Sequence, residues 1–470
     1  MKNDAELKEK CAVFGVSLCS EEAVGMTYNG LLSLQHRGQE GAGIAAVHAN
    51  GIYGHKSVGL VSEIFTKDSL AKFPLSRIAV GHTRYSTTGS NSIANTGPFI
   101  TEYLTGRIAT AHNGNITNAR SLREALQSRG LSFNASSDSE VLSSLIAYHT
   151  MQGTDVVSGI TQAVHSLHGA FSLVIASGEN KLIAVRDPSG YRPLCVGVSE
   201  SGIAFSSESC ALEACGFALV RDVLPGEILV AENAKLISST VLPQNDDVRR
   251  GLCIFEFVYF ARPDSVLDGL SVYEARYNMG VVLAEEYPVD ADIVCGVPDS
   301  GLEAASGYSA RSGIPLVAGF VKNRYIGRSF IYPTQSERDD AVRLKLNPLA
   351  ANMAGKRVVL VDDSIVRGTT CARIIKNLRK AGAAQVHMRV SSPPFVHTCH
   401  YGTDIDSEEN LLANNMSRDE ICRKIGADSL GYISVAGLKR ACVKCKTSFC
   451  TTCFTGTSSS EVITKDILEE

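Results

Sequence analysis

The chain has 470 residues, 44% of them hydrophobic, and a formal charge of −4 at pH 7 from 45 Lys and Arg against 49 Asp and Glu. This length predicts two or three domains, and the charge gives no general reason to bind nucleic acid or an anionic membrane. No run approaches the ~18 consecutive apolar residues of a membrane span, and the first residues lack the apolar core of a secretory signal. Fourteen cysteines without such a signal indicate a reducing, cytoplasmic setting with buried, catalytic or metal-bound thiols.

The front of the chain resembles a leader to be removed. Ten mostly charged residues, MKNDAELKEK, precede Cys11 and the apolar strand-like run CAVFGVSL. Cleavage between Lys10 and Cys11 would give Cys11 a thiol and a free α-amine, which is a nucleophile and a base on one residue. An α-amine has a pKa of ~8, so part of it is neutral at working pH. We therefore expect residues 1–10 to be a propeptide; the alternative is a buried cysteine in a first strand after a frayed terminus.

The first half mixes strands and helices in blocks, which predicts an α+β layered fold. Expected strands are 78–81, 107–111, 170–176, 181–185 and 227–231, and expected helices are 22–34, 119–128, 137–149 and 154–166. The polar segment LPQNDDVRR, with its proline, suggests a domain boundary, giving domains 11–245 and 246–470.

The second half alternates strands and helices, which predicts right-handed βαβ units and an α/β fold with a parallel sheet. The expected order is helix 271–287, strand 291–298, helix 302–312, strand 314–320, strand 357–361, helix 369–381 and strand 384–391. We expect 409–440 to be a helical appendage, in which SRDE (417–420) predicts a capping box.

Polar motifs in the first half suit amide hydrolysis by a thiol. The Asn113 side chain and the Gly114 backbone N–H, in AHNGN, could stabilise an oxyanion. Arg84 in GHTRYSTTG could bind an amino acid's carboxylate, and Asp138 in SDSE its ammonium group. Each has a simpler interpretation: a hairpin turn for Asn-Gly, a surface ion pair for Arg84, and a dipole-favoured helix start for Asp138.

Together with Cys11 and QHRGQ, these motifs make residues 11–240 resemble the class II glutamine amidotransferase domain, an N-terminal-nucleophile hydrolase with a four-layer sandwich fold. The resemblance implies that Cys11 is the nucleophile and that Asn113 and Gly114 form the oxyanion hole. It further implies that Arg84 and Asp138 bind glutamine and that Arg37 belongs to the same glutamine site and helps to order it.

The strongest single motif is VVLVDDSIVRGTT (358–370), an apolar strand followed by a loop and a helix. Backbone N–H groups at a helix start bind phosphate, and the carboxylates of Asp362 and Asp363 could meet ribose hydroxyls or Mg²⁺. The alternative is a capped turn with two solvated acids. In VCGVPDSG, the turn at Asp299-Ser300-Gly301 could bind pyrophosphate. The basic segment 322–345 suggests a lid over a polyphosphate or, alternatively, a solvated loop.

This half resembles the type I phosphoribosyltransferases, and the whole chain resembles the amidophosphoribosyltransferase family. The resemblance implies that glutamine-derived ammonia converts phosphoribosyl pyrophosphate (PRPP) to 5-phosphoribosylamine, with glutamate and pyrophosphate as the other products, in the first committed step of purine biosynthesis. It implies Mg²⁺ at Ser300, Asp362 and Asp363, purine nucleotides as inhibitors, and a homo-oligomer, a homotetramer or a dimer. The implied PRPP-binding residues are Asp362, Asp363, Ser364, Val366, Arg367, Gly368, Thr369, Thr370, Lys322 and Arg328. Rival interpretations are a PRPP-sensing regulator and another class II amidotransferase.

The cysteines allow two alternative metal sites, which share Cys450 and Cys453. Cys253, Cys399, Cys450 and Cys453 could hold zinc or an iron–sulfur cluster. Cys442 and Cys445 form a second C-x-x-C motif. A compact zinc site of Cys442, Cys445, Cys450 and Cys453 is therefore an alternative that the spacing allows equally well. The family resemblance, together with the leader, implies a 4Fe–4S cluster on Cys253, Cys399, Cys450 and Cys453.

Overall fold

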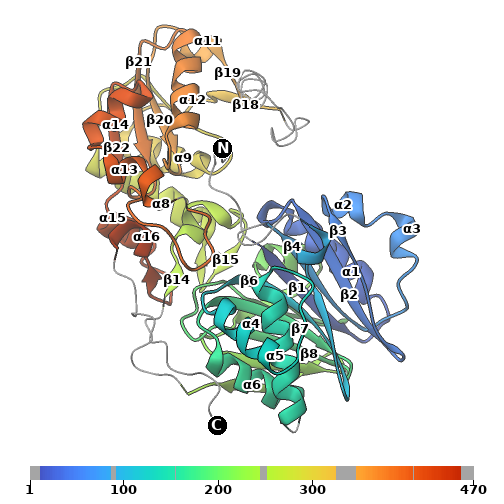
Figure 1. The fold of residues 1–470 in the computed structure, drawn as a ribbon. Coiled ribbons are helices and arrows are strands. Elements are labelled where there is room, and N and C mark those ends of the chain that lie inside the picture. Colours follow the sequence, from blue (N-terminus) through green and yellow to red (C-terminus); the bar gives the residue numbers. More distant parts are fainter. Residues whose placement is uncertain are drawn as a thin grey trace.

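The computed structural model describes residues 11–85, 92–153, 155–243, 251–323, 346–405 and 407–456. Two units lie side by side, one formed by the first half of the chain and the other by the second half (Figure 1). The expected propeptide 1–10 and the expected boundary at 245/246 lie outside the described residues.

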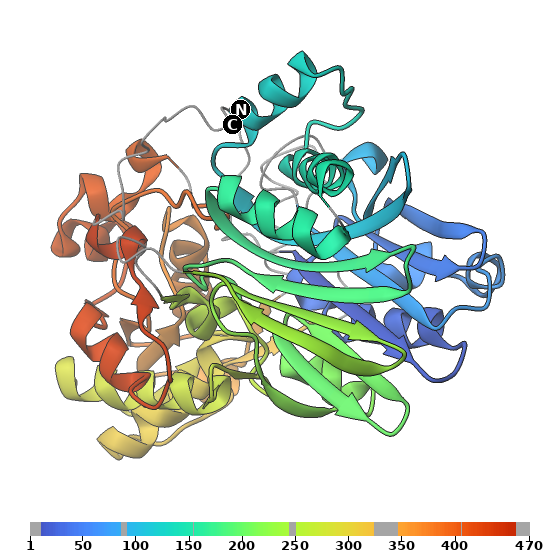
Figure 2. The ribbon, with the colours of Figure 1, turned by 90° about the horizontal axis from the view of Figure 1, so that it is seen from below.

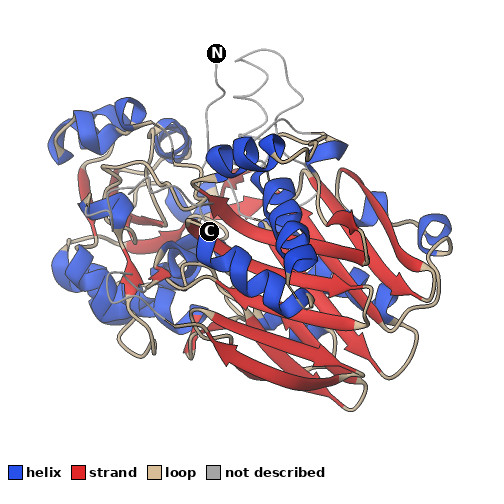
Figure 3. Ribbon diagram, turned by 60° about the horizontal axis from the view of Figure 1, so that its bottom comes forward, coloured by secondary structure: helices blue, strands red, loops and turns tan. Residues whose placement is uncertain are grey.

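The first unit contains two antiparallel sheets in the described part of the chain (Figure 3). The seven-stranded sheet has the order β11 (Ala218–Asp222), β9 (Cys195–Ser199), β10 (Gly202–Ser206), β1 (Ala12–Leu18), β4 (Ile78–Arg84), β2 (Gly41–His48) and β3 (Gly51–Val58). The six-stranded sheet has the order β13 (Lys235–Val241), β12 (Glu227–Glu232), β8 (Lys181–Arg186), β7 (Gly169–Ser177), β6 (Gly106–Ile116) and β5 (Phe99–Tyr103). Buried apolar residues such as Val13, Val80, Ala109 and Val174 pack between the two sheets.

Helices cover the outer face of each sheet, as Figure 2 shows for the green helices over the six-stranded sheet. The seven-stranded sheet is covered by α1 (Ala23–Ser33), α2 (Val61–Ile64) and α7 (Ser209–Ala214), and the six-stranded sheet by α4 (Ala119–Ser128), α5 (Asp138–Gln152) and α6 (Val156–Ser166). Strand β1 explains the arrangement, because Phe14 and Val16 pack under α1 while Val13 faces the other sheet. The predicted four-layer sandwich is confirmed.

The second unit is built on a parallel sheet of order β17 (Ile293–Gly296), β20 (Arg357–Asp362), β21 (Gln385–Val390) and β22 (Ser429–Tyr432). Its two faces are covered by α8 (Val272–Glu286), α9 (Gly301–Ser312) and α15 (Val435–Ala441) on one side, and by α12 (Thr369–Lys380) and α14 (Arg418–Ile425) on the other. Alternate residues of β20 face opposite covers, with Val359 and Val361 toward α8 and α9, and Val358 and Leu360 toward α12. The predicted α/β fold is therefore confirmed.

Short elements complete the two units. They are η1 (Gln35–Arg37), α3 (Lys67–Leu70), η2 (Ile93–Asn95), β14 (Leu252–Cys253), η3 (Glu256–Phe260), β15 (Val266–Leu267), β16 (Leu270–Ser271), β18 (Phe320–Lys322), β19 (Leu346–Pro348), α11 (Ala350–Met353), η5 (Glu408–Asn410), α13 (Leu412–Asn415), β23 (Phe449–Cys450) and α16 (Thr452–Thr455). No helix among the described residues is both long and apolar enough to span a membrane.

The segment 409–440 differs from the prediction. Its capping box is present, with Ser417 accepting from the Glu420 backbone and Glu420 bonding back to Ser417. However, Ser429–Tyr432 forms β22 and pairs with β21, so the segment completes the sheet instead of forming a helical appendage. A strand of this length leaves too little alternation in the sequence to be recognised.

Candidate active sites

Cys11 lies directly before β1, in a pocket of the first unit. The pocket is lined by Cys11 and by residues of β4, β6 and the start of α5, including Arg84, Gly114 and Asp138. The Cys11 Sγ lies 3.5 Å from both the carbonyl oxygen and the backbone nitrogen of Tyr85. Pairing of β1 with β4 sets this contact, because Ala12 is opposite Thr83 in the ladder.

The electrostatic environment keeps the Cys11 sulfur protonated at neutral pH. Burial raises the pKa of the Cys11 thiol, while the Tyr85 backbone and the positive charge of Arg84 act in the opposite direction. The carboxylates of Asp138 and Glu40 raise it further. A nucleophilic role for this sulfur therefore requires a nearby base.

Asn113 and Gly114 belong to the middle of β6 rather than to a turn. They pair with Ser172 and Phe171 of β7. Gly114 has φ +152, and a Cβ there would meet the Ala170 carbonyl oxygen at 1.9 Å, so the position requires glycine. The Asn113 side chain is 1% exposed, and within the described residues its Nδ2 has no hydrogen-bond partner. The hairpin-turn alternative is therefore wrong.

Asp138 begins α5 and is held at the pocket edge. Its Oδ2 accepts from the Ile116 backbone at 2.9 Å, and its Oδ1 accepts from the hydroxyls of Ser137 and Ser139 at 3.3 and 3.4 Å. Ser137 caps the helix by accepting from the Ser139 backbone. The carboxylate is thus fixed by β6 and by its own helix start.

Arg37 is not among the residues that line the pocket. It lies behind Cys11, is 1% exposed, and donates from Nε to the Cys11 carbonyl oxygen at 3.3 Å. Its other nitrogens donate to Glu208 and Glu256. This geometry suits the ordering role that the sequence suggested for Arg37 and leaves it no direct contact with a molecule in the pocket.

Two histidines also line the pocket, and the sequence analysis did not single them out. His82 Nε2 lies 3.0 Å from the His112 carbonyl oxygen, and His112 Nδ1 lies 2.9 Å from the Ser139 hydroxyl. Burial lowers the pKa of His82 to about 3 and lowers that of His112 as well. Both imidazoles are therefore neutral. The sequence could have pointed to them only through their places within the motifs GHTR and AHNG.

The second candidate site lies where β17 and β20 end. Asp362 closes β20, and its Oδ1 accepts from the Asp363 backbone at 2.9 Å. Asp363 accepts from the hydroxyls of Ser300, before α9, and of Ser364. The parallel pairing of β17 with β20 thus joins two motifs that are far apart in the sequence.

The loop after Asp363 leads into α12. Gly368 is the N-cap with φ +72, and Thr369 and Thr370 open the helix, so its first N–H groups are available to an anion. The Val366 carbonyl accepts from the Leu412 backbone at 3.1 Å, and Arg367 lines a cleft with residues of 409–416. Lys322, on β18, forms an ion pair with Asp299. Arg328 and most of the expected lid lie outside the described residues.

The oxygen donors of this site fit a magnesium ion. Ser300, Asp362 and Asp363 present hydroxyl and carboxylate oxygens, which Mg²⁺ prefers. The described residues contain no group of three or more His, Cys, Asp or Glu suited to holding an ion by themselves. Mg²⁺ is usually held by one or two carboxylates together with water and substrate phosphates, so these residues could act as its protein ligands.

The cysteines divide into two groups. Cys253 and Cys450 are partners in the parallel pair β14–β23. Burial raises the pKa of Cys453, and the charges of Cys253, Cys399 and Cys450 raise it further. Burial likewise raises the pKa of Cys442, and the charge of Cys445 raises it further. Thus Cys450 and Cys453 lie with Cys253 and Cys399, and Cys442 lies with Cys445.

This grouping bears on which cysteines could share a metal group. Both zinc and a four-iron cluster take four thiolates, and Cys253, Cys399, Cys450 and Cys453 are the four that lie together. The compact zinc alternative would require Cys442 and Cys445 to join Cys450 and Cys453.

Comparisons with known proteins agree with the two units. Residues 82–214 match the family model of a glutamine amidotransferase domain, and residues 279–392 match that of a phosphoribosyl transferase domain. The fold and its two sites define an amidotransferase unit joined to a phosphoribosyltransferase unit in one chain.

Full-length relatives give the family. An amidophosphoribosyltransferase of Methanocaldococcus jannaschii is 45% identical over 97% of this chain and 99% of its own. One from Synechocystis sp. is 47% identical over 96% of this chain and 90% of its own. The chain belongs to the amidophosphoribosyltransferase family.

Solved structures agree with this assignment. A glutamine PRPP amidotransferase from B. subtilis, complexed with ADP and GMP, matches with a TM-score of 0.89 and 42% identity over 97% of this chain and 98% of its own. A structure described as the allosteric regulatory enzyme of purine biosynthesis also gives a TM-score of 0.89, with 42% identity and 97% of both chains covered.

Proposed function

We propose that this chain makes 5-phosphoribosylamine from glutamine and PRPP, the first committed step of purine biosynthesis. Its full-length relatives carry the name of this activity. The observation that carries the proposal is the presence, in one chain, of a buried thiol pocket and an acid-lined phosphate loop. The pocket holds Cys11, Arg84 and Asp138, and the loop follows β20.

In the first half-reaction, the Cys11 sulfur attacks the side-chain amide carbon of glutamine. Because burial raises the pKa of this thiol, its proton needs an acceptor. The α-amine released by cleavage between Lys10 and Cys11 is that acceptor, and it then protonates the leaving ammonia. Water hydrolyses the thioester to glutamate and restores the thiol.

The pocket stabilises the charge that develops on glutamine. The Nδ2 of Asn113 and the backbone N–H of Gly114 donate to the oxyanion. This role accounts for the buried side-chain amide of Asn113, whose Nδ2 has no other hydrogen-bond partner among the described residues. Arg84 binds the α-carboxylate and Asp138 the α-ammonium group, and both line the pocket beside Cys11. Arg37 fixes Cys11 through its carbonyl oxygen.

In the second half-reaction, ammonia passes within the protein and attacks the anomeric carbon of PRPP, and pyrophosphate leaves. The carboxylates of Asp362 and Asp363 bind the ribose hydroxyls, and the start of α12 binds the 5-phosphate through Gly368, Thr369 and Thr370. Mg²⁺, when bound near Ser300 and the two aspartates, neutralises charge on the pyrophosphate. Exclusion of water protects both the thioester and the sugar.

We further propose that Cys253, Cys399, Cys450 and Cys453 hold a 4Fe–4S cluster with a structural role. The reaction transfers no electrons, so the four thiolates serve to join β14, the loop at Cys399 and the end of the described chain. Cys450→Ser should lose a brown absorbance near ~400 nm and bound iron, whereas Cys442→Ser should retain both. Equal iron contents in the two variants would contradict this ligand set.

Two experiments test the main proposal. The intact mass of the active enzyme should correspond to a chain that starts at Cys11. Cys11→Ser should abolish the use of glutamine and leave the use of free ammonia intact, because the second site does not contain the thiol. A full-length chain with normal glutamine turnover, or a folded variant that loses both activities, would contradict the mechanism.

Regulation by nucleotides is part of the proposal. The B. subtilis enzyme binds ADP and GMP, and we expect purine nucleotides to inhibit this enzyme as well. Glutamine hydrolysis should also stay slow until PRPP binds, which a steady-state assay with and without PRPP measures. The homotetramer or dimer implied by the family remains a prediction, which sedimentation equilibrium would test.

A further inference from the structure

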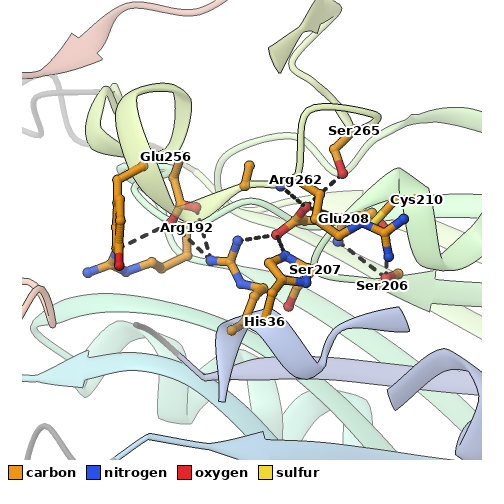
Figure 4. Close-up of polar contacts among 12 residues, drawn as sticks. His36, Arg192, Ser206, Ser207, Glu208, Cys210, Glu256, Arg262 and Ser265 are labelled. Carbon is orange, nitrogen blue, oxygen red and sulfur yellow. Dashed lines mark hydrogen bonds and ion pairs between the residues drawn. The ribbon is translucent and has the colours of Figure 1, made fainter. Parts of the chain in front are cut away.

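A group of fully buried charges lies where the two units meet, shown in Figure 4. Glu208, which precedes α7, and Glu256, which begins η3, are each 0% exposed. Arg37 and Arg192 of the first unit are 1% and 0% exposed. Two carboxylates thus face two guanidinium groups away from water, which is an arrangement that requires close pairing.

Arg37 divides its donors among three partners. Its Nη1 donates to Glu208 Oε1 at 2.5 Å, and its Nη2 donates to both oxygens of Glu256 at 3.0 and 3.1 Å. Its Nε donates to the Cys11 carbonyl oxygen at 3.3 Å. The two carboxylates therefore fix the plane of the guanidinium group, and that plane directs Nε at Cys11.

Each carboxylate is itself held across the boundary. Glu208 also accepts from the Ser265 hydroxyl at 2.7 Å and the Arg262 backbone at 2.9 Å, both from the second half of the chain. Glu256 forms a second ion pair, 3.5 Å long, with Arg192. Arg192 in turn donates to the carbonyl oxygen of Tyr401, in the segment that carries Cys399.

We propose that Glu256, supplied by the phosphoribosyltransferase unit, is a positioning residue for the glutamine half-reaction and acts through Arg37 on Cys11. The inference rests on the proposed nucleophilic role of Cys11. After cleavage Cys11 is a terminal residue joined to the chain by one peptide bond, so the orientation of that bond sets where its sulfur and amine point. Arg37 fixes the bond's oxygen, and Glu256 fixes Arg37.

The decisive variant is Glu256→Gln, which keeps the shape and removes the charge. With one counterion lost, Arg37 pairs with Glu208 alone and Nε no longer points at Cys11. We expect kcat with glutamine to fall at least 10-fold with little change in KM for glutamine. Turnover with free ammonia should stay within 2-fold. Iodoacetamide should alkylate Cys11 at a different rate, measured by mass spectrometry.

The matched control is Asp268→Asn, at another buried ion pair across the same boundary. Asp268 accepts from Arg186 through both oxygens at 2.9 Å, and the remaining Arg186 donors go to backbone carbonyls of the first unit, not to Cys11. If Glu256 only held the two units together, both variants would lower glutamine turnover equally, and that result would overturn the proposal. Normal kcat for Glu256→Gln would also overturn it.

A second variant covers the possibility that Glu256→Gln does not fold, which loss of ammonia-dependent turnover would reveal. Arg37→Lys keeps a cation between the carboxylates but lacks the fork that reaches Cys11, so it should also lose glutamine turnover selectively. An Arg37→Lys enzyme with normal glutamine turnover would overturn the proposal. Cys11→Ser distinguishes the proposals: if it still uses glutamine, the proposed nucleophile is wrong, whatever Glu256 does.

Discussion

The two sites of this chain are built in opposite ways. In the glutamine pocket, Arg84 and Asn113 belong to β4 and β6 and are 4% and 1% exposed, and Asp138 at the start of α5 is 9% exposed. In the phosphate site, Asp362 and Asp363 at the end of β20 are also buried, but the loop that follows, from Ser364 to Thr370, is largely half-buried or exposed. The first site is therefore preorganised by the sandwich, whereas the second presents open backbone donors to a ligand.

This difference shows that the two half-reactions need different kinds of binding site. A thioester needs a dry pocket with donors fixed in advance. A large, highly charged substrate such as PRPP needs an open edge with N–H groups and hard oxygen ligands. Substitutions in the glutamine pocket should consequently lower turnover with glutamine alone, whereas substitutions in the phosphate site should lower turnover with glutamine and with ammonia.

The broadest expected effect comes from Asp363→Asn. Asp363 accepts from Ser300 and Ser364, and by our proposal its charge meets ribose and Mg²⁺, which both nitrogen sources require. We expect turnover to fall about 100-fold to 1,000-fold with glutamine and with ammonia alike, measured as pyrophosphate release. An effect confined to glutamine would break the proposed separation of the sites.

Asn113→Ala should affect only the buried pocket. Loss of one oxyanion donor typically lowers kcat about 100-fold to 1,000-fold, and here only glutamine turnover should fall. Asn115→Ala is the control, since its Nδ2 donates to the His400 carbonyl at 2.8 Å instead of to the pocket. Comparable kcat values for the two variants would show that Asn113 is not the donor.

The difference between the sites also explains what the sequence could predict. The phosphate loop was predictable because an apolar strand, two acids and a Gly-Thr-Thr helix start are contiguous in VVLVDDSIVRGTT. Helices such as α4, expected at 119–128 and found at Ala119–Ser128, were predictable from their apolar periodicity. Contiguous signals of this kind need no knowledge of the tertiary fold.

The buried pocket was only partly predictable, because its partners are remote in sequence. Arg37 meets Glu208 and Glu256, which lie 171 and 219 positions away, and nothing local marks either carboxylate. Asn113-Gly114 has the composition of a turn but lies in β6, since β7 pairs with it. Likewise, spacing left the cysteine groups open, whereas the β14–β23 pairing brings Cys253 beside Cys450.

Acid should weaken the buried site through His82. Burial holds its pKa at about 3 in the folded protein, below the ordinary ~6.5, so its contribution to stability is present above pH 6.5 and is lost as pH falls from 6.5 toward 3. Between pH 7 and pH 5 this loss is about 2 kcal/mol. His82→Gln should flatten the pH dependence of the urea midpoint over that range. His387→Gln, in the second unit, should flatten it less, because the carboxylate of Asp428 opposes the lowering of the His387 pKa by burial.

The smallest effect is expected at the open loop, from Gly368→Ala. Gly368 has φ +72, and its added Cβ would meet the flexible end of Leu412 at 2.6 Å. The left-handed backbone costs about 1–2 kcal/mol for a residue with a Cβ, seen as a lower urea midpoint. Gly426→Ala is the matched control, because Gly426 ends α14 with φ +77 and its Cβ would meet only Ile375 at 4.0 Å. Both variants should lose similar stability, but only Gly368→Ala should raise KM for PRPP, because by our proposal the helix that Gly368 caps binds the 5-phosphate. An equal KM for PRPP in the two variants would mean that Gly368 is not needed to bind the phosphate. The contrast between an open phosphate site and a buried glutamine pocket would then no longer hold.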